Sequence, residues 1–324
     1  MRAWRLHELG EPAEKLHLEE VDDLRPGPGQ VLIDVAATGL TFPDVLMCQG
    51  RYQMPTQVPY TPGGEVSGTV AAVGEGVFSI AVGERVVSMS GKGLAERVIA
   101  NAAITFRLPD EVAFEKAAAL IVNYGTTFYA LHTRGQLAEG ETLLVTGAAG
   151  GTGTAAIQLG LAAGARVVAV AGGDEKAALC RALGAHVVID HRREPDWVDA
   201  VKAATDGKGV DVAYDPVGGD TFHKVRRCMG WGGRLLVIGF VEGIPDTPVN
   251  HVLLKSYSIV GVYWGESLAR FPGSLDGQMQ ALLALTASGA IDPPVQTYDF
   301  ADGAKALQQL ADRGVVGKLV VRGA

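Results

Sequence analysis

A glycine-rich turn at residues 147–153 has the residue types and spacing needed to hold a phosphate group. It follows the apolar segment TLLV and precedes the helical segment TAAIQL, in the order strand, turn, helix. Glycine permits the positive φ angles of such a turn, and without a Cβ the backbone N–H groups can approach a pyrophosphate. The dipole of the following helix adds to the attraction, so the pattern predicts a dinucleotide-binding turn. The residues expected to contact the cofactor here are Gly147, Ala149, Gly150, Gly151, Thr152 and Gly153.

The end of the next strand predicts which dinucleotide binds. The segment RVVAVA (166–171) is followed by Gly172, where an NAD-binding fold usually carries an acid for the ribose 2′-hydroxyl. Without that carboxylate a 2′-phosphate is not repelled, so NADPH is favoured over NADH. We interpret Asp174 as the N-cap of the next helix and not as the missing acid, because it precedes Glu175 and a helical run. The side chains expected to contact the 2′-phosphate are Lys176, His191 and Arg192, with Arg193 as a further cation.

The patterns of secondary structure change near residue 122 and divide the chain. Before it, short alternating segments such as 30–39 and 65–74 are broken by Gly and Pro, which predicts an antiparallel, barrel-like domain. Beyond it, strands alternate with helices of about ten residues, which is typical of a doubly wound parallel sheet. The six strands expected in that sheet are 142–147, 166–171, 186–190, 210–217, 233–239 and 257–264.

The last part of the chain is expected to return to the first domain. Its elements are a helix at 276–289, a strand at 295–300, a helix at 301–313 and a strand at 317–322. These strand-rich pieces do not continue a βαβ pattern, so they do not extend the parallel sheet. The predicted α/β organisation is a dinucleotide-binding domain at 123–267 inserted into a β-rich catalytic and substrate domain formed by 1–122 and 268–324.

Composition and charge exclude several classes of protein. The net charge is −8, from 28 basic and 36 acidic residues, and no basic stripe is visible, so no nucleic-acid partner is expected. The N-terminal segment lacks the apolar stretch of a signal peptide, and no apolar span of about 20 residues occurs, so no membrane segment is expected. The three cysteines are far apart in sequence, which fits reduced thiols and predicts a cytoplasmic protein.

Five further segments, together with the glycine turn, resemble the medium-chain dehydrogenase/reductase superfamily, specifically its zinc-free quinone oxidoreductase (zeta-crystallin-like) branch. They span nearly the whole chain in the right order: GLTFPDVLMCQGRY (39–52), PGGEVSGTVAAVGEGV (62–77), NYGTTFYAL (123–131), AYDPVGGDTF (213–222) and GKLVV (317–321). The resemblance implies a Rossmann domain inserted into a chaperonin-10-like β-barrel, with the active site in the cleft between the two. It also implies a homodimer that forms by edge pairing of the strand at 257–264.

The same segments predict that no metal binds. Zinc-dependent relatives carry a Cys in the loop matching 39–44 and a His in the stretch matching PGGE, whereas this sequence has Thr41, Phe42, Gly64 and Glu65 there. A catalytic zinc needs about three protein ligands, and no Cys–His set is left to supply them. The four-cysteine structural lobe of those relatives is missing as well.

The resemblance also assigns roles to individual residues. Hydride transfer to an enone, quinone or enoyl thioester places negative charge on an oxygen, which requires a hydrogen-bond donor and a proton. Tyr52 matches a tyrosine that donates a proton in related enoyl-thioester reductases, and its alternative interpretation is an aromatic packed in the cleft wall. Thr41 stands where this branch usually carries Asn. In a catalytic role, Thr41 is therefore expected to be a weaker hydrogen-bond donor than that Asn. Asn123 and Thr127 match residues that contact the nicotinamide or the phosphates, and Phe240 is expected near the nicotinamide carboxamide.

Three functions remain open at this point. The first is an NADPH-dependent, zinc-independent reductase of quinones or related α,β-unsaturated carbonyl compounds. The second is an enoyl-thioester (acyl-CoA) reductase, and the third is a non-catalytic, crystallin-like NADPH-binding protein. The sequence names neither the physiological electron acceptor nor the choice between one- and two-electron reduction. Asp215, which follows an apolar strand, is interpreted as a structural acid in the turn and not as a catalytic one.

Overall fold

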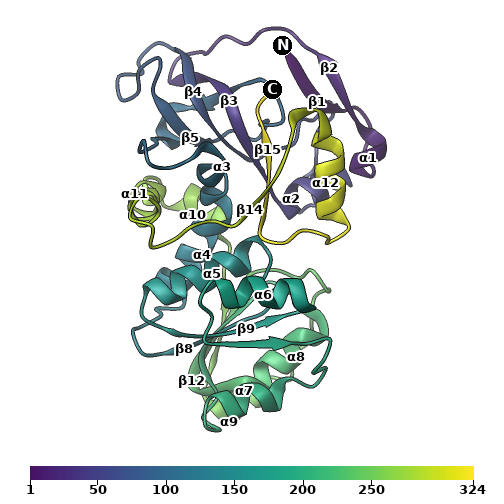
Figure 1. Cartoon of the computed structure of the whole chain (residues 1–324), viewed down its shortest axis with the longest axis vertical. Helices are drawn as coiled ribbons and strands as arrows, with labels where there is room; N and C mark the ends of the chain where they lie inside the picture. Colours follow the sequence, from purple (N-terminus) through teal and green to yellow (C-terminus); the bar gives the residue numbers. More distant parts are fainter. The chain divides into compact units, whose positions relative to one another are not determined.

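The computed structural model describes residues 1–324 and divides into two compact units. Unit 1 comprises Met1–Val122 and Leu275–Ala324, and unit 2 comprises Asn123–Ser274, which runs from teal to green in Figure 1. The chain returns to unit 1 later than the predicted residue 268. The reason is that helix α10 (Trp264–Arg270) packs within unit 2, where a Cβ on Gly125 would lie 2.7 Å from the Trp264 ring.

Unit 2 is built on a six-stranded parallel sheet in the order β10-β9-β8-β11-β12-β13. The strands are β8 (Thr142–Val145), β9 (Arg166–Ala171), β10 (Val187–Asp190), β11 (Val210–Asp215), β12 (Met229–Val237) and β13 (Ser258–Gly261). The helices between them are α5 (Gly151–Ala162), α6 (Asp174–Ala182), α7 (Val198–Ala204), α8 (Gly219–Cys228) and α9 (Asn250–Lys255). The predicted doubly wound sheet is therefore confirmed, and its order reverses beside β8, where ligands bind in such folds.

The sequence of unit 2 explains why its sheet is buried on both faces. Leu143, Leu144 and Val145 of β8 are fully buried, as the near-continuous apolar runs of parallel strands require. Helix α5 is buried at every position from 153 to 160, so it carries small and apolar residues all round instead of one apolar stripe. No helix of the chain is long and apolar enough to cross a membrane. The cytoplasmic location stays a prediction.

Unit 1 contains a mostly antiparallel sheet in the order β14-β15-β3-β4-β5-β7, with β6 also pairing β3. Its strands are β3 (Gln30–Leu40), β4 (Glu65–Val73), β5 (Arg85–Met89), β6 (Arg97–Asn101), β7 (Thr105–Arg107), β14 (Val295–Tyr298) and β15 (Lys318–Arg322). The C-terminal strand β15 runs antiparallel to β3, so the end of the chain does complete the first sheet. A separate pair that the sequence analysis did not predict, β1 (Arg2–Leu6) and β2 (Leu16–Glu20), lies outside this sheet.

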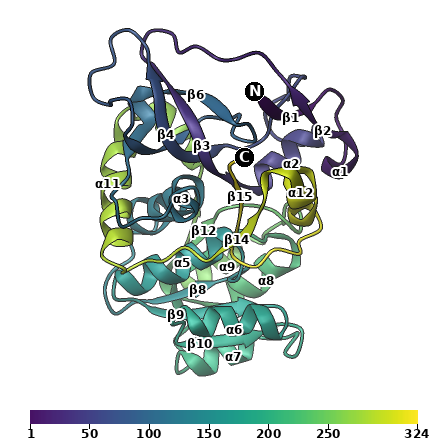
Figure 2. The same ribbon diagram turned by 45° about the horizontal axis from the view of Figure 1, so that its top comes forward.

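The helices of unit 1 cover one part of this sheet. They are α1 (Pro12–Lys15), α2 (Phe42–Cys48), α3 (Phe114–Ala117), α11 (Ser274–Ala287) and α12 (Gly303–Ala311). Helix α12 packs beside α1 and α2, as Figure 2 shows, and its buried Leu307 joins an apolar core with Leu6 and Leu40. The N-terminal and C-terminal segments of unit 1 thus share one core.

A buried ion pair joins β4 to β15. The Lys318 ammonium donates to the carboxylate of Glu65, and these side chains are 3% and 0% exposed. The second Glu65 oxygen accepts a hydrogen bond from the Val122 N–H at 2.9 Å. Gly39 leaves room for the carboxylate, since a Cβ there would lie 2.8 Å from Glu65 Cγ. Each charge therefore depends on its partner, because neither can be solvated by water.

Replacing Lys318 by Met should lower the free energy of unfolding by about 3–5 kcal/mol, because it leaves the Glu65 carboxylate buried without a counter-charge. Urea denaturation followed by circular dichroism measures the loss. The double variant Glu65→Leu/Lys318→Met is the control, because it removes both charges and should recover most of that stability. It should retain a cost of about 1 kcal/mol for the Val122 N–H that loses its acceptor. A double variant as unstable as Lys318→Met would contradict the assignment.

Candidate functional site

Where α5 comes closest to the end of β8, the turn between them leaves no room for a side chain. A Cβ on Gly153 would lie 2.3 Å from the carbonyl oxygen of Gly147 and 2.7 Å from Cα of Ala148. Gly147 has φ +55°, and the Gly150 N–H donates to the Gly147 carbonyl at 3.0 Å. Glycine at these positions therefore brings the first turn of α5 against the end of β8.

The start of α5 keeps hydrogen-bonding capacity for an anion. Its N-cap is Gly150, and no side chain caps the helix, so the first N–H groups have no partner within the helix. A Cβ on Gly150 would meet only the Gly147 carbonyl, at 3.4 Å, which leaves the space above the turn open. Backbone donors, the helix dipole and free space together fit a pyrophosphate.

Asn123 lies against the same helix start. It belongs to a π-helical turn (Leu120–Tyr124) that precedes α4 (Gly125–Phe128), and π turns often occur at functional sites. Its side chain is mostly buried, and a Cβ on Gly151 would lie 2.0 Å from the Asn123 amide nitrogen. Two segments that are far apart in sequence, the NYGTT stretch and the glycine turn, are thus adjacent in unit 2.

Thr127 is also close to this turn, but its hydroxyl forms hydrogen bonds within unit 2. The Thr127 Oγ1 donates to the Asn123 carbonyl at 2.8 Å and lies 3.0 Å from the hydroxyl of Tyr214. Burial raises the pKa of Tyr214 to about 12, so its hydroxyl stays protonated at neutral pH. Thr127 is fully buried and bonds back along the helix instead of capping it, and its contact with a cofactor stays a prediction.

Basic side chains gather over the end of β9, where the sequence lacks an acid. A Cβ on Gly172 would lie 2.5 Å from Nε2 of His191 and 3.3 Å from Nε of Arg192. Asp190, at the end of β10, accepts the N–H groups of Gly173 at 2.8 Å and of Arg192 at 3.0 Å. These hydrogen bonds lower the pKa of Asp190 and fix the loop that carries both basic residues. Asp190 was not among the predicted site residues, although the acid at the end of HVVID is visible in the sequence.

The N-cap prediction for Asp174 is wrong. Gly173, with φ +92°, is the N-cap of α6, and Asp174 is its first residue. The Asp174 carboxylate instead pairs with Arg193 at 2.6 Å, and Arg193 also lies 3.7 Å from Asp190. Arg193 is therefore neutralised by two acids, whereas Arg192 forms no ion pair. Lys176 lies half-buried on the first turns of α6.

Two other predicted positions lie at the carboxyl end of the sheet. Phe240 follows β12, and its ring would lie 3.3 Å from a Cβ on Gly218. Asp215 at the end of β11 accepts a hydrogen bond from Thr146 at 2.6 Å and from the Val217 N–H at 3.0 Å. Burial raises the pKa of Asp215, and these contacts agree with its predicted structural role.

In unit 1 the structure gives Thr41 a local role. Thr41 is the N-cap of α2, and its hydroxyl and its backbone N–H both donate to one oxygen of Asp44 at 2.7 Å. The other Asp44 oxygen accepts the Gly63 N–H at 2.9 Å. Since a hydroxyl has one proton to donate, Thr41 could help a substrate oxygen only by leaving Asp44. Tyr52 lies half-buried in the irregular segment after α2, and the catalytic roles of both residues stay predictions.

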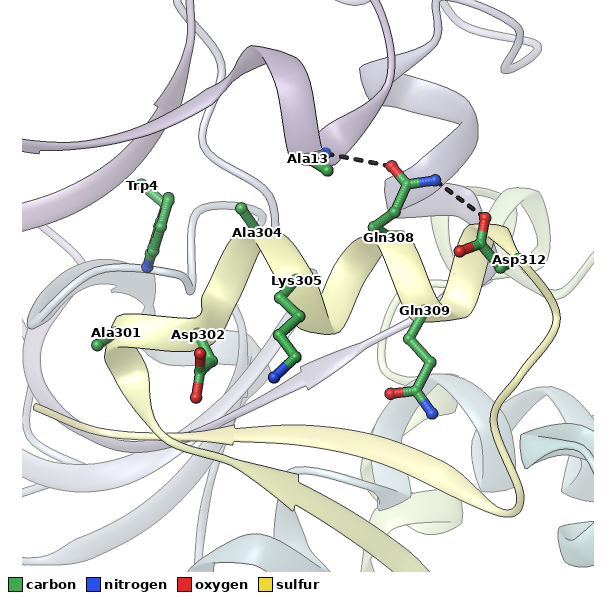
Figure 3. A pocket seen from close by; sticks show the side chains of 9 residues that line it. All are labelled: Trp4, Ala13, Ala301, Asp302, Ala304, Lys305, Gln308, Gln309 and Asp312. Atoms are coloured by element: carbon green, nitrogen blue, oxygen red, sulfur yellow. Dashed lines mark hydrogen bonds between the residues drawn. The ribbon is translucent and has the colours of Figure 1, made fainter.

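The structure contains no group of three or more His, Cys, Asp or Glu side chains placed to hold a metal ion. A cavity of about 480 Å³ lies beside α12 in unit 1, where Gln308 accepts from the Ala13 N–H at 3.2 Å and donates to Asp312 at 3.0 Å (Figure 3). It is lined by Trp4, Ala13, Ala301, Asp302, Ala304, Lys305, Gln308, Gln309 and Asp312. None of the predicted site residues borders this cavity.

Comparisons with known proteins cover both units. Residues 27–110 match the family model described as alcohol dehydrogenase GroES-like domain, and residues 151–284 match the one described as zinc-binding dehydrogenase. The chain is 35% identical to quinone oxidoreductase-like protein 2 homolog of Nematostella vectensis, over 99% of this chain and 88% of that protein.

Two solved structures extend the likeness to three dimensions. Escherichia coli quinone oxidoreductase complexed with NADPH is 29% identical, with a TM-score of 0.91 over 99% of this chain and 100% of that one. A probable oxidoreductase from Mycobacterium abscessus is 38% identical, with a TM-score of 0.91 over 99% and 98% of the two chains. The likeness therefore extends over the whole chain and not over one domain alone.

The same substitution at two glycines should change stability in opposite directions. Gly153→Ala should lower the free energy of unfolding by about 1–3 kcal/mol, because the new methyl group meets the backbone of Gly147 and Ala148. Gly277→Ala is the control, since a Cβ at this position in α11 meets nothing within 4 Å. It should raise stability by about 0.5–1 kcal/mol. Thermal and chemical denaturation of both variants measure the difference. If Gly153→Ala is as stable as the parent chain, the close contact of α5 with Gly147 and Ala148 is contradicted.

Proposed function

This chain belongs to the quinone oxidoreductase branch of the medium-chain dehydrogenase/reductase superfamily, and on that premise we propose that it is an NADPH-dependent reductase of quinones or related α,β-unsaturated carbonyl compounds. The observation that carries the proposal is the pairing of an open glycine turn with two basic side chains over Gly172. The first fits a pyrophosphate and the second fits a 2′-phosphate. The Escherichia coli quinone oxidoreductase structure, which contains NADPH, supports the same cofactor for this chain.

The residues that would hold the cofactor divide into two groups. Backbone N–H groups of Gly151, Thr152 and Gly153 at the start of α5 would bind the pyrophosphate. Arg192 and His191 would bind the 2′-phosphate by charge-assisted hydrogen bonds. When bound, NADPH supplies a hydride at its nicotinamide ring.

The substrate side of the reaction requires a donor that stabilises negative charge on a carbonyl oxygen. Thr41 is a weak candidate, because its only hydroxyl proton is held by the Asp44 carboxylate. Tyr52 carries a phenol that can donate a proton to an enolate or a reduced quinone. We therefore assign proton donation to Tyr52 and helix capping to Thr41, and we propose that the reaction uses no metal.

We also propose that the chain forms a homodimer through β13. This strand ends the sheet of unit 2 and has one edge without a neighbouring strand. Beside it, α9 and the preceding loop expose large apolar side chains: Val249 is 74% exposed, Leu253 79% and Leu254 69%. An unpaired strand edge next to exposed apolar residues is the kind of surface that pairs with a second copy.

The choice of cofactor can be tested at the loop that follows β10. Arg192→Gln should raise the dissociation constant for NADPH about tenfold, equivalent to about 1.4 kcal/mol, and leave that for NADH unchanged. Titration of the reduced cofactors by fluorescence measures both constants. Arg193→Gln is the matched control, because Arg193 is already paired with Asp174, and it should change neither constant more than about twofold. Equal loss for NADH and NADPH would show that Arg192 does not contact a 2′-phosphate.

The activity itself can be tested by stopped-flow oxidation of NADPH with 1,4-quinones, simple enones and crotonyl-CoA offered separately. We expect turnover with quinones or enones. Tyr52→Phe should lower kcat by about 10²-fold or more, with unchanged affinity for NADPH, because a general acid contributes on that scale. Tyr60→Phe is the control, since the Tyr60 hydroxyl donates to the sulfur of Met47.

Two outcomes would overturn the proposed reaction. Preference for crotonyl-CoA would identify an enoyl-thioester reductase. Tight binding of NADPH without turnover of any acceptor would identify a non-catalytic binding protein. An unchanged kcat in Tyr52→Phe would make Tyr52 a packing residue.

A further inference from the structure

Among the buried side-chain polar atoms of unit 2 that have no hydrogen-bond partner, three lie on elements that follow one another around β12 and β13. They are Nε of Arg226 in α8, Nδ1 of His251 in α9 and the hydroxyl of Tyr257 just before β13. Tyr257 is only 2% exposed, and its ring meets that of His251 edge-on, with centroids 5.9 Å apart. A buried polar group without a partner costs about 1–3 kcal/mol, and native proteins leave few of them.

The surroundings of these atoms are positively charged. Arg226 forms no ion pair, and its charge acts on both of the other side chains. Burial, Arg226 and Lys255 together lower the pKa of His251. Burial raises the pKa of Tyr257, and the charge of Arg226 opposes that rise. Lys255 itself donates to the carbonyls of Arg227 and Met229, at 3.2 Å and 2.7 Å.

The neighbouring acids are already paired with other cations. Asp196 lies 3.6 Å from Arg227, and Asp199 of α7 lies 3.8 Å from Lys202. Neither acid is within ion-pair distance of Arg226. The half-buried Arg226 side chain therefore forms no ion pair within the chain.

We propose that Arg226, His251 and Tyr257 form a binding site for a small oxyanion of the phosphate or sulfate type. Such an anion can accept a hydrogen bond from the guanidinium Nε–H, from the phenol and from the imidazole in its Nδ1–H form. It would also supply the missing negative charge. A single water molecule can accept only two of these three hydrogen bonds and leaves the guanidinium uncompensated.

The site is separate from the proposed cofactor site. Tyr257 directly precedes β13, and Arg226 lies in the last turn of α8 shortly before β12, so both lie at the amino ends of these parallel strands. The glycine turn follows the carboxyl end of β8 in the same sheet. The two anion sites therefore occupy opposite edges of the sheet, and the second one does not depend on the proposed reaction.

Titration of the full chain with sodium phosphate, at constant ionic strength in Hepes and sodium chloride, tests the proposal. Isothermal calorimetry should detect binding, and thermal melting should show stabilisation. Arg226→Gln should weaken phosphate binding at least tenfold. Arg227→Gln, an exposed neighbour on the same helix, should bind phosphate as the parent chain does. Arg192→Gln removes a cation of the proposed cofactor site, and it should keep the part of the phosphate response that Arg226→Gln loses. If Arg192→Gln loses the phosphate response and Arg226→Gln keeps it, phosphate binds at the glycine turn and the proposal fails.

Tyr257→Phe gives a second test that does not depend on a charge change. Without phosphate the variant should be at least as stable as the parent chain, because it removes a hydroxyl that has no partner. With phosphate it should gain less stability than the parent chain, because the anion loses one donor. Equal destabilisation in both buffers would mean that the hydroxyl bonds to water, and it would overturn the proposal. The proposal is also overturned if phosphate does not bind the parent chain.

Discussion

The close approach of α5 to the end of β8 is the contact on which the proposed cofactor site depends. It exists because Gly153 has no Cβ to meet the Gly147 carbonyl. The approach places the N–H groups of the first helical turn directly above the sheet, at the position where the strand order reverses. The same helix start leaves room at Gly151 for the side chain of Asn123. The absence of a Cβ at Gly153 therefore allows α5 to pack closely on β8 and also places its first N–H groups where an anion could bind.

The hydrogen bonds around the turn keep this arrangement rigid. Thr146, just after β8, donates to Asp215 at the end of β11, and the same carboxylate accepts the Val217 N–H. On the other side, Asp190 holds the loop that carries His191 and Arg192. Acids are therefore present beside the proposed cofactor site, but each accepts hydrogen bonds from donors of its own. An acidic chain can therefore still gather basic side chains over the end of β9, where we propose that a 2′-phosphate binds.

The regular part of the fold could be predicted from the sequence because its signals are local. Buried parallel strands such as LLV in β8 form apolar runs, and the helices between them end at glycines such as Gly164. The pair β1 and β2 could not be recognised, because RAWRL and LHLEE mix charged with apolar residues and show no clean alternation. The return of the chain at Leu275 depends on packing of Trp264 against Gly125, which no local pattern reveals.

The site residues show the same division between local and distant causes. Asp174 has the pattern of an N-cap, yet the backbone of Gly173 and the charge of Arg193 decide otherwise. The capping box of Thr41 and Asp44 was visible in the spacing T-x-x-D, and it explains the Thr41 hydroxyl without any substrate.

The absence of an ion pair has different consequences for an exposed cationic side chain and for a buried one. An exposed guanidinium is solvated by water, so the lack of an ion pair at Arg192 would mean little by itself. What makes Arg192 informative is the missing side chain of Gly172 beneath it, which lets His191 and Arg192 lie over the end of β9, where no acid is present. Arg226 differs because its Nε–H is buried without a hydrogen-bond partner. Arg234 shows the usual solution in this chain, since its half-buried guanidinium binds both oxygens of Glu141, at 2.8 Å and 2.7 Å. The contrast between Arg234 and Arg226 is therefore the strongest reason to look for an anion at the second position.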